Sequence, residues 1–257
     1  MPDGRFESWL SSLEARHLAD LTFPEVARAL RALSSAYVER RQKLADGAAF
    51  SGAGKRAAFA LFYAPLHFLL VERIVRQLQP VARPVAALVD LGCGTGAASA
   101  AWAASQVDAE AVGPLVIGVD RNAWALTEAA DTYRTFGIDA RVRRGDASAL
   151  IDLSPRSRPA AWLAAFTINE LTDADREALL RRLLTRACEG DAVLIVEPIG
   201  RVVGRWWAVW RSEFERAGGR ADEWRFPIDR PSMVAKLDAA AGLDHREITG
   251  RSLWISL

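Results

Sequence analysis

The feature that most constrains this chain is a run of three alternating glycines, Gly92, Gly94 and Gly96, directly after an apolar segment that ends in Asp90. Glycine lets the backbone turn sharply and approach a ligand closely, because no Cβ lies in the way. A helix that begins directly after such a loop presents unpaired backbone N–H groups and a partial positive charge. An apolar strand, a glycine loop and a helix in this order predict a nucleotide-cofactor site.

The acid before the loop distinguishes between two kinds of cofactor. Gly92-x-Gly94-x-x-Ala97 also satisfies the dinucleotide pattern in its Gly/Ala form, so the glycines alone leave a nicotinamide coenzyme as an alternative. The Asp90 carboxylate would repel a pyrophosphate on the loop, whereas it suits the cationic amino acid end of S-adenosylmethionine. We therefore predict S-adenosylmethionine as the cofactor. Within the loop, Cys93 is expected to line the site as a small packed residue.

Two further loops are expected to hold the adenosine. Asp120 ends the next apolar strand, where a carboxylate accepts both ribose hydroxyls. The structural alternative is that it caps the helix beginning near Asn122. Arg121 is expected to flank the adenine. After the third strand, Asp146 is expected to accept from the adenine amino group, while Ala147 donates its backbone N–H.

Methyl transfer is an in-line displacement at a sulfonium carbon, so the protein mainly orients the nucleophile and, for a hydroxyl, removes its proton. Asn169 and Glu170 follow the fourth expected strand, 161–167, whose end carries Phe166 as a predicted cofactor contact. Tyr63 and His67 lie in a helical segment able to cover the cleft. We predict that His67, Tyr63 and Glu170 form the catalytic neighbourhood. The structural alternative is a core position for the first two, and for Glu170 a bond to a backbone amide or an arginine.

The chain divides at a proline-containing segment, residues 79–84. Apolar residues at three- and four-residue spacing predict a helical extension or lid over residues 1–82. Alternating strands and helices over 83–257 predict an α/β domain with a mostly parallel, seven-stranded sheet and helices on both faces. Strands are expected at 86–90, 115–120, 140–144, 161–167 and 192–197, a helix at 123–136, and the last two strands at 243–249 and 252–256.

Composition excludes several classes of protein. With 257 residues, 51% of them hydrophobic, the chain can build a sizeable core. Its two cysteines, Cys93 and Cys188, rule out a disulfide scaffold, and no Cys/His group has metal-site spacing, so a cytoplasmic protein without a metal is expected. No secretory leader or apolar run of membrane-spanning length is found in the sequence, the longest candidate being 57–71. The net charge of +1 gives no global field for recruiting RNA.

A tryptophan-rich stretch near residue 206 admits two interpretations. Trp206 and Trp210 are four residues apart and share a helical face, while Trp207 points elsewhere. Core packing is the favoured interpretation. In the alternative, these rings and Arg201, Arg205 and Arg211 form a wall over the acceptor, or stack on exposed nucleobases.

The run Leu-Gly-Cys-Gly-Thr-Gly at 91–96, preceded by Asp90, closely resembles the first motif of class I S-adenosylmethionine-dependent methyltransferases. Residues 90–200 resemble that superfamily, and the stretches 29–41, 166–171 and 194–198 resemble its ribosomal small-subunit methyltransferase-like branch. The resemblance implies a Rossmann-like fold in which the loop acid and the three glycines line the methionine end of the cofactor. It also implies that the acids at 120 and 146 hold the ribose and the adenine.

The sequence departs from that branch at Ala160, where many relatives have an acid at the start of the fourth strand. It departs again in its cysteines, because two of them cannot form the cluster that holds an iron–sulfur centre in many members of the branch. This departure and the near-neutral charge favour an enzyme that methylates an oxygen or nitrogen of a small-molecule or peptide acceptor. The alternative is an assembly factor of the ribosomal small subunit, which the Arg40-Arg41 pair and the Arg-Trp stretch keep open. The acceptor and the oligomeric state stay open at this stage.

Overall fold

The computed structural model describes residues 4–39, 50–78, 84–106, 113–148, 158–199 and 205–256. Its centre is a seven-stranded sheet of order β3-β2-β1-β4-β5-β7-β6. The first five strands are parallel, and β7 runs antiparallel to both β5 and β6. The predicted fold class is confirmed. The strands are β1 (Ala87–Leu91), β2 (Leu115–Asp120), β3 (Ala140–Arg144), β4 (Ala160–Ala165), β5 (Ala192–Glu197), β6 (Arg220–Pro227) and β7 (Glu247–Ile255).

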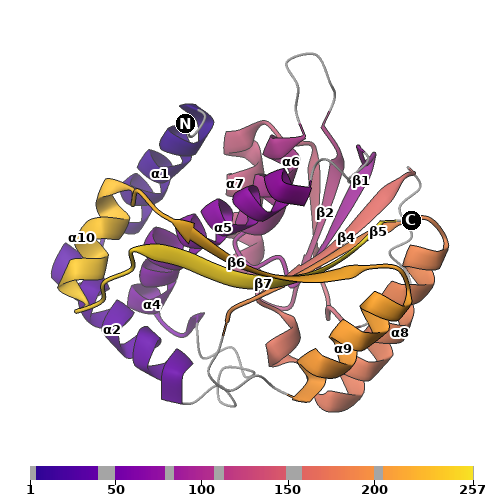
Figure 1. Cartoon of the computed structure of the whole chain (residues 1–257). Helices are drawn as coiled ribbons and strands as arrows, with labels where there is room; N and C mark the ends of the chain where they lie inside the picture. Colours follow the sequence, from indigo (N-terminus) through magenta and orange to yellow (C-terminus); the bar gives the residue numbers. More distant parts are fainter. Residues whose placement is uncertain are drawn as a thin grey trace.

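Helices cover both faces of the sheet (Figure 1). One face packs against α5, α6 and α7, and the other against α8 and α9. The helical elements are α1 (Gly4–His17), α2 (Phe23–Glu39), α4 (Ala53–Ala58), the π-helix η2 (Phe59–Tyr63), α5 (Ala64–Leu78), α6 (Ala97–Ser105), α7 (Ala123–Phe136), the short 3₁₀ helix η5 (Ile168–Glu170), α8 (Asp173–Cys188), α9 (Arg205–Arg216) and α10 (Ser232–Ala240).

The central strands are buried on both sides, as expected of a parallel sheet between helical layers. Successive residues of β1 alternate between the two cores, with Leu88 in the core under α5 and α6, and Val89 in the core under α8. In β4, Leu163 and Trp162 divide in the same way. The strand order reverses between β1 and β4, and ligands of open α/β sheets bind at the carboxyl ends of the strands at such a point.

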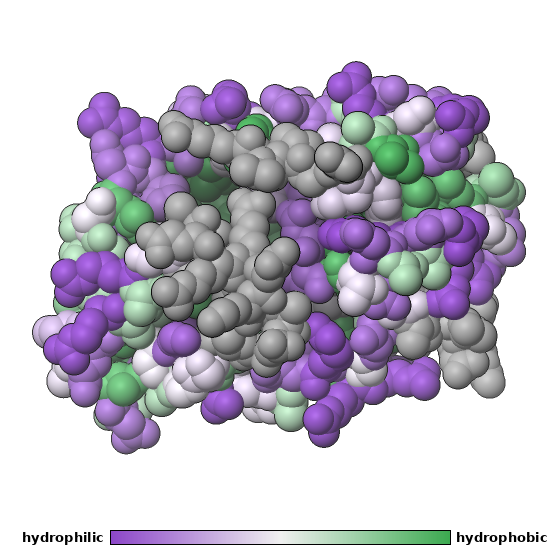
Figure 2. All heavy atoms as spheres, turned by 90° about the horizontal axis from the view of Figure 1, so that it is seen from below, coloured by the Kyte–Doolittle hydropathy of each residue, from purple (hydrophilic) through white to green (hydrophobic). Residues whose placement is uncertain are grey.

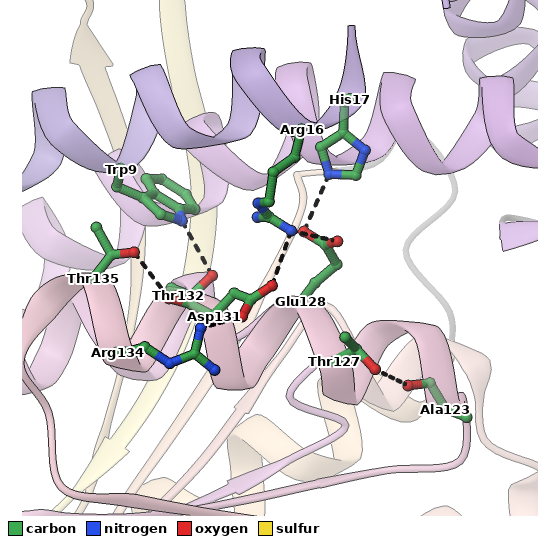
Figure 3. A network of polar contacts seen from close by, with 10 residues as sticks. All are labelled: Trp9, Arg16, His17, Ala123, Thr127, Glu128, Asp131, Thr132, Arg134 and Thr135. Atoms are coloured by element: carbon green, nitrogen blue, oxygen red, sulfur yellow. Dashed lines mark hydrogen bonds and ion pairs between the residues drawn. The ribbon is translucent and has the colours of Figure 1, made fainter. Parts of the chain in front are cut away.

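The N-terminal helices pack closely on the sheet domain. The helix α5 is one of the layers covering the sheet, and α1 lies along α7 (Figure 3). Trp9 is buried, and its indole N–H donates to the hydroxyl of Thr132 at 3.1 Å. The carboxylate of Glu128 accepts hydrogen bonds from Arg16 at 2.8 Å and is 3.1 Å from Nε2 of His17. The expected division at residue 82 falls at 79–83, outside the described residues, so the lid remains a prediction.

The prediction for the last two strands was wrong. Residues 247–255 form one strand, β7, and the other antiparallel strand is β6, at 220–227. The Gly250 position does not end a strand, because its hydrogen faces α5: a Cβ there would lie 2.8 Å from Cδ2 of Leu70. The strand β6 escaped prediction because it lies at the sheet edge and is rich in charged residues.

The continuous helical segment Ala53–Leu78 is long and apolar enough to cross a membrane by length and composition. In this fold 78% of its apolar window is buried inside the protein. Its apolar surface is therefore accounted for by the core that it forms with α6 and β7.

Candidate functional site

The glycine loop after β1 has the backbone that its sequence predicts. Gly92, Gly94 and Gly96 have φ values of 71°, 52° and 76°, a region that other residues rarely adopt. A Cβ at Gly92 would lie 2.5 Å from the side chain of Thr167, whereas one at Gly94 would meet nothing within 4 Å. The loop thus packs tightly on one side and is open on the other. No side chain caps α6 at Gly96, so the first N–H groups of this helix are available to a ligand.

Asp90 is the group in the site that most calls for a ligand. It is 1% exposed, and neither carboxylate oxygen has a hydrogen-bond partner among the described residues. The neighbouring Ser99 hydroxyl is engaged with Tyr133 at 2.8 Å. Burial raises the pKa of Asp90 to about 7. The nearby polar groups of Ser99 oppose this shift, and the negative charge of Asp120 adds to it. An unpaired buried carboxylate is costly, so a cationic ligand fits this position.

Asp120 ties the glycine loop to the next helix. One carboxylate oxygen accepts from the Gly94 N–H at 3.0 Å, and the other from the Asn122 N–H at 2.8 Å. The α7 cap itself is Asn122, whose side chain accepts from the N–H groups of Trp124 and Ala125. A carboxylate oxygen has a second lone pair, so the predicted ribose contact is compatible with these bonds.

The predicted adenine loop is ordered by its own hydrogen bonds. Asp146 accepts from both the N–H and the hydroxyl of Ser148 at 2.8 Å, and these bonds hold its pKa below the usual range. Nη1 of Arg121 lies 4.0 Å from the same carboxylate. Ala147 and Cys93 are buried, and burial raises the pKa of the Cys93 thiol, as befits a packed residue. Their contacts with a cofactor remain predictions.

Phe166 brings the end of β4 against the helical segment. The strand ends at Ala165, short of the expected Thr167, because Phe166 has a φ of 60°. Its ring stacks on His67, with ring centroids 3.7 Å apart and planes inclined by 15°. Burial lowers the pKa of His67 to about 3, so the imidazole is neutral at physiological pH. His67 therefore does not fit the role of a base that titrates in the ordinary histidine range.

Tyr63 lies one helical turn before His67, at the end of the π-helix η2. Burial raises the pKa of its phenol above the usual value, and a hydrogen bond with Ser34 opposes this shift. The phenol is therefore protonated at physiological pH, which suits an orienting group better than a base.

Glu170 has the properties of a base in a cleft. Its side chain is exposed to solvent but surrounded by protein on most sides, and it makes no hydrogen bond or ion pair with a described residue. This partial desolvation raises its pKa to about 7; the Asp120 charge adds to the shift, and Arg121 opposes it. The structural alternative, a bond to a backbone amide or an arginine, is not seen across the described residues.

Glu197 is an acid at a strand end whose sequence context does not indicate a role, and the structure shows one. It is fully buried at the end of β5 and accepts from the N–H groups of Ile168 at 2.8 Å and Asn169 at 3.3 Å. The Asn169 side-chain amide also donates to it. Nε1 of Trp206 donates to the Asn169 Oδ1 at 3.1 Å. The whole η5 turn that carries Glu170 is thereby held in place.

The tryptophan-rich stretch packs in the core as expected, but the prediction that Trp207 points elsewhere was wrong. Trp207 and Trp210 are buried in the core under α8 and α9, and the guanidinium of Arg251 lies 3.9 Å from the ring centre of Trp207. Arg211 forms an ion pair with Glu215 on the surface. The described part of the chain does not include residues 40–49 and 200–204. The other arginines considered for RNA, Arg40, Arg41 and Arg201, therefore lie outside it, as does the side chain of Arg205.

Four acids at the carboxyl ends of β1, β2, β4 and β5 therefore share one edge of the sheet, on the lower side in Figure 1. The surface seen from that side is mostly hydrophilic, with smaller hydrophobic areas between (Figure 2). Charge repulsion couples Asp90 to Asp120, Asp120 to Glu170 and Glu170 to Glu197. Such an edge suits the sulfonium and ammonium groups of S-adenosylmethionine and disfavours a pyrophosphate.

Part of the chain matches a known family, and solved structures have a similar fold. Residues 88–189 match a family described as a methyltransferase domain. The structure of mitomycin 7-O-methyltransferase is 14% identical, with a TM-score of 0.51, and the match covers 100% of this chain and 74% of that one. Magnesium protoporphyrin IX methyltransferase from Synechocystis, solved with S-adenosylmethionine bound, is 14% identical, with a TM-score of 0.48 and coverage of 91% and 98%. A search among curated proteins found no matching sequence.

The glycine loop, the acidic edge and the family match define a nucleoside-cofactor enzyme of the Rossmann-like class. By this match residues 88–189 are a methyltransferase domain, and S-adenosylmethionine is the cofactor that its glycine loop and acids are predicted to hold.

Proposed function

We propose that this methyltransferase methylates an oxygen or nitrogen atom of a small-molecule or peptide acceptor, with Glu170 as the proton acceptor. The observation that carries the proposal is the position of Glu170, which lies exposed at the carboxyl edge of the sheet without a side-chain partner among the described residues and has a pKa of about 7. A group with that pKa is half ionised near neutrality, where a general base is most effective.

The bound cofactor would supply a methyl group on a positively charged sulfur. The residues of the cleft bind and orient it. Asp90 faces the cationic amino acid end, and the open side of Gly94 lets the ligand approach the backbone. Asp120 offers its remaining lone pairs to the ribose, while Asp146 and Ala147 receive the adenine. The acidic edge lowers the cost of holding a cation in a partly dry cleft.

The cofactor would supply its methyl group to the acceptor oxygen or nitrogen in an in-line displacement in which the sulfur leaves with the electron pair of its bond, and the turn that bears Glu170 would orient the attacking atom. The acceptor proton passes to the Glu170 carboxylate and then to solvent. Glu197 keeps the η5 turn in place during this step, because it holds two consecutive backbone N–H groups of that turn. Orientation and proton removal are together sufficient for this reaction.

The N-terminal helices are proposed to cover the cofactor cleft. Phe50, before α4, contacts Trp124 at the start of α7, with ring centroids 5.0 Å apart. The guanidinium of Arg56 lies over the same indole at 5.6 Å. Trp124 lies in the first turn of α7, four residues after Asp120, so these contacts bring the helical segment next to the predicted adenosine site. Removal of residues 1–50 is expected to impair methyl transfer more than cofactor affinity.

Transfer of a labelled methyl group tests the proposal. Purified protein, methyl-tritiated S-adenosylmethionine and a fractionated cell extract are incubated, and label is followed in the low-mass, peptide and RNA fractions. We expect label in a low-mass or peptide fraction, its loss in Glu170→Gln, and full activity in Glu177→Gln, which removes an exposed acid paired with Arg181 on α8. Label confined to ribosomal RNA, together with sedimentation of the protein with small ribosomal subunits, would instead support the ribosomal alternative.

A further inference from the structure

Four ring side chains form a continuous row beside the glycine loop: Phe59, Tyr63, His67 and Phe166. The row begins in η2, passes along the start of α5 and ends on the turn after β4. The rings of Phe59 and His67 meet edge to face with centroids 5.8 Å apart, and those of His67 and Phe166 are stacked. Tyr63, His67 and Phe166 are only partly buried, unlike the fully buried rings of the main core.

Two unusual backbone conformations meet in this row. Phe166 adopts a left-handed conformation, which is unfavourable for a residue with a Cβ. The opposite side is a π-helical turn, a conformation that is rare and frequently found at functional sites. Strain of this kind persists where the surrounding structure imposes it, and it concentrates at ligand sites.

The row adjoins the reacting end of the cofactor site. Thr167, next to Phe166, hydrogen-bonds to the Gly92 carbonyl at 3.3 Å and fills the space against the loop that a Cβ at Gly92 would occupy. Three residues after Thr167 comes Glu170, the base proposed above. An acceptor lying on the rings would therefore have the methyl donor on one side and a carboxylate within the same turn of chain.

The charge state of the rings selects the acceptor. The environment of His67 is so poorly hydrated that the imidazole stays neutral, and the Tyr63 phenol is protonated. The rings themselves offer no charge to offset the lost hydration of a charged acceptor, and the neighbouring acids would repel an anion. Flat, neutral rings in contrast gain from offset or edge-to-face packing on aromatic side chains.

We propose that the acceptor is a neutral planar aromatic molecule, which packs on the row formed by Phe59, Tyr63, His67 and Phe166 and directs a hydroxyl or amino group at Glu170. This inference rests on the proposed function, since it names the acceptor class of the same site.

A pair of matched probes tests the inference. Binding of 2-naphthol and of its saturated analogue decahydro-2-naphthol is measured by calorimetry, with the protein saturated by S-adenosylhomocysteine. The two probes share the hydroxyl group and the carbon skeleton, and differ in planarity and aromaticity. We expect 2-naphthol to bind about 5–10-fold more tightly, as stacking energies imply. Equal affinity of the two probes, or no binding of 2-naphthol, would overturn the inference.

Two variants and a control locate the probe. Phe166→Gly removes the ring and keeps the turn, because glycine readily adopts a positive φ. Tyr63→Leu removes a second ring at similar volume. We expect each to weaken 2-naphthol about fivefold or more, and Phe226→Leu, a partly buried ring stacked on Trp224 in β6, to leave it unchanged.

The variants also separate this inference from the proposed function. Affinity for S-adenosylhomocysteine is expected to stay within about twofold in Tyr63→Leu and Phe226→Leu, which shows that the fold and the cofactor site are intact in these two variants. One outcome would retain the methyltransferase mechanism and reject the aromatic acceptor. In that outcome the protein binds the cofactor tightly and Glu170→Gln loses label transfer, but the two probes bind with equal affinity. Full label transfer in Glu170→Gln would reject the base and leave the probe result to decide the acceptor class.

Discussion

His67 and Phe166 stack face to face, with ring centroids 3.7 Å apart, although 99 positions along the chain separate them. The stack fixes the end of β4 against α5 and keeps the imidazole away from water, so its pKa falls to about 3. A histidine with that pKa is a weak base at neutral pH, and the role of His67 is to support the aromatic row.

The pH dependence of the rate distinguishes the two candidate bases. Glu170 is ionised above its pKa of about 7, so the rate of methyl transfer should rise as pH increases from about 6 to 8. His67→Phe, which preserves a stacking ring, should retain this rising limb, with a rate reduced less than about tenfold. Glu170→Gln should lose the limb and about 100-fold in rate. Loss of the limb in His67→Phe alone would return the base to His67.

Replacement of Asp90 should raise the stability of the cofactor-free protein and lower its affinity for S-adenosylmethionine. Its folded pKa of about 7 lies above the usual value of 3.8, so the cofactor-free protein loses stability as pH rises through that interval. Asp90→Asn should therefore raise the Tm of the cofactor-free protein by about 3 °C or more at pH 8, with little change at pH 4. The same variant should bind S-adenosylmethionine at least about tenfold more weakly. Scanning calorimetry and titration calorimetry measure the two effects, and a parallel fall in both quantities at pH 8 would count against an unpaired carboxylate.

Asp120→Ala should weaken S-adenosylmethionine binding by about 2 kcal/mol, because two ribose hydroxyls lose a charged acceptor. Since Asp120 also accepts from the Gly94 and Asn122 N–H groups, Asp120→Asn is the gentler variant, keeping one acceptor for the loop. Titration calorimetry on correctly folded protein measures both, with the exposed Asp173→Ala as control. Unchanged affinity in Asp120→Ala would refute the ribose assignment.

The contact between α1 and α7 should depend on Glu128 (Figure 3). Burial alone raises the pKa of this carboxyl, but the hydrogen bonds from His17 and Arg16 outweigh that effect and lower it. Its stabilising contribution is therefore present above the unfolded pKa of about 4.5 and is lost as pH falls through the lower folded value. Glu128→Gln should cost about 2 kcal/mol of unfolding free energy at pH 7, since Arg16 is partly solvated. Urea unfolding measures this, and the exposed Glu177→Gln should cost less than about 0.5 kcal/mol.

Much of the cofactor half of the site follows from the sequence because its signals are local. The strands β2, β3 and β5 and the helix α7 have the predicted bounds, and the loop after β1 has the positive φ values that its glycines indicate. In each case apolar periodicity and a neighbouring glycine or acid act within a few residues. The same locality gave the approximate position of Glu170 after β4.

The acceptor half depends on contacts between distant segments, which no single-sequence pattern encodes. No glycine in the sequence indicates the left-handed conformation at Phe166. The low pKa of His67 arises from packing against the Phe166 ring. The antiparallel edge was misplaced since Gly250 reflects the approach of α5 and does not mark a turn. Glu197 showed only an acid at a strand end, and its role depends on the turn that it holds from the neighbouring strand.

Glu197→Gln should separate positioning from binding. The carboxylate accepts from the Ile168 and Asn169 N–H groups and from the Asn169 side chain, whereas a glutamine amide has one oxygen and would place its own donors against the others. A flip of the Asn169 amide cannot compensate, because its oxygen already accepts from the Trp206 indole. We expect the η5 turn to shift and the rate of methyl transfer to fall about 10–100-fold. Cofactor affinity should stay within about twofold, since the glycine loop and Asp120 are untouched. The exposed Glu247→Gln at the start of β7 is the control. A variant with a normal rate, or one whose affinity falls as far as its rate, would contradict a positioning role for Glu197.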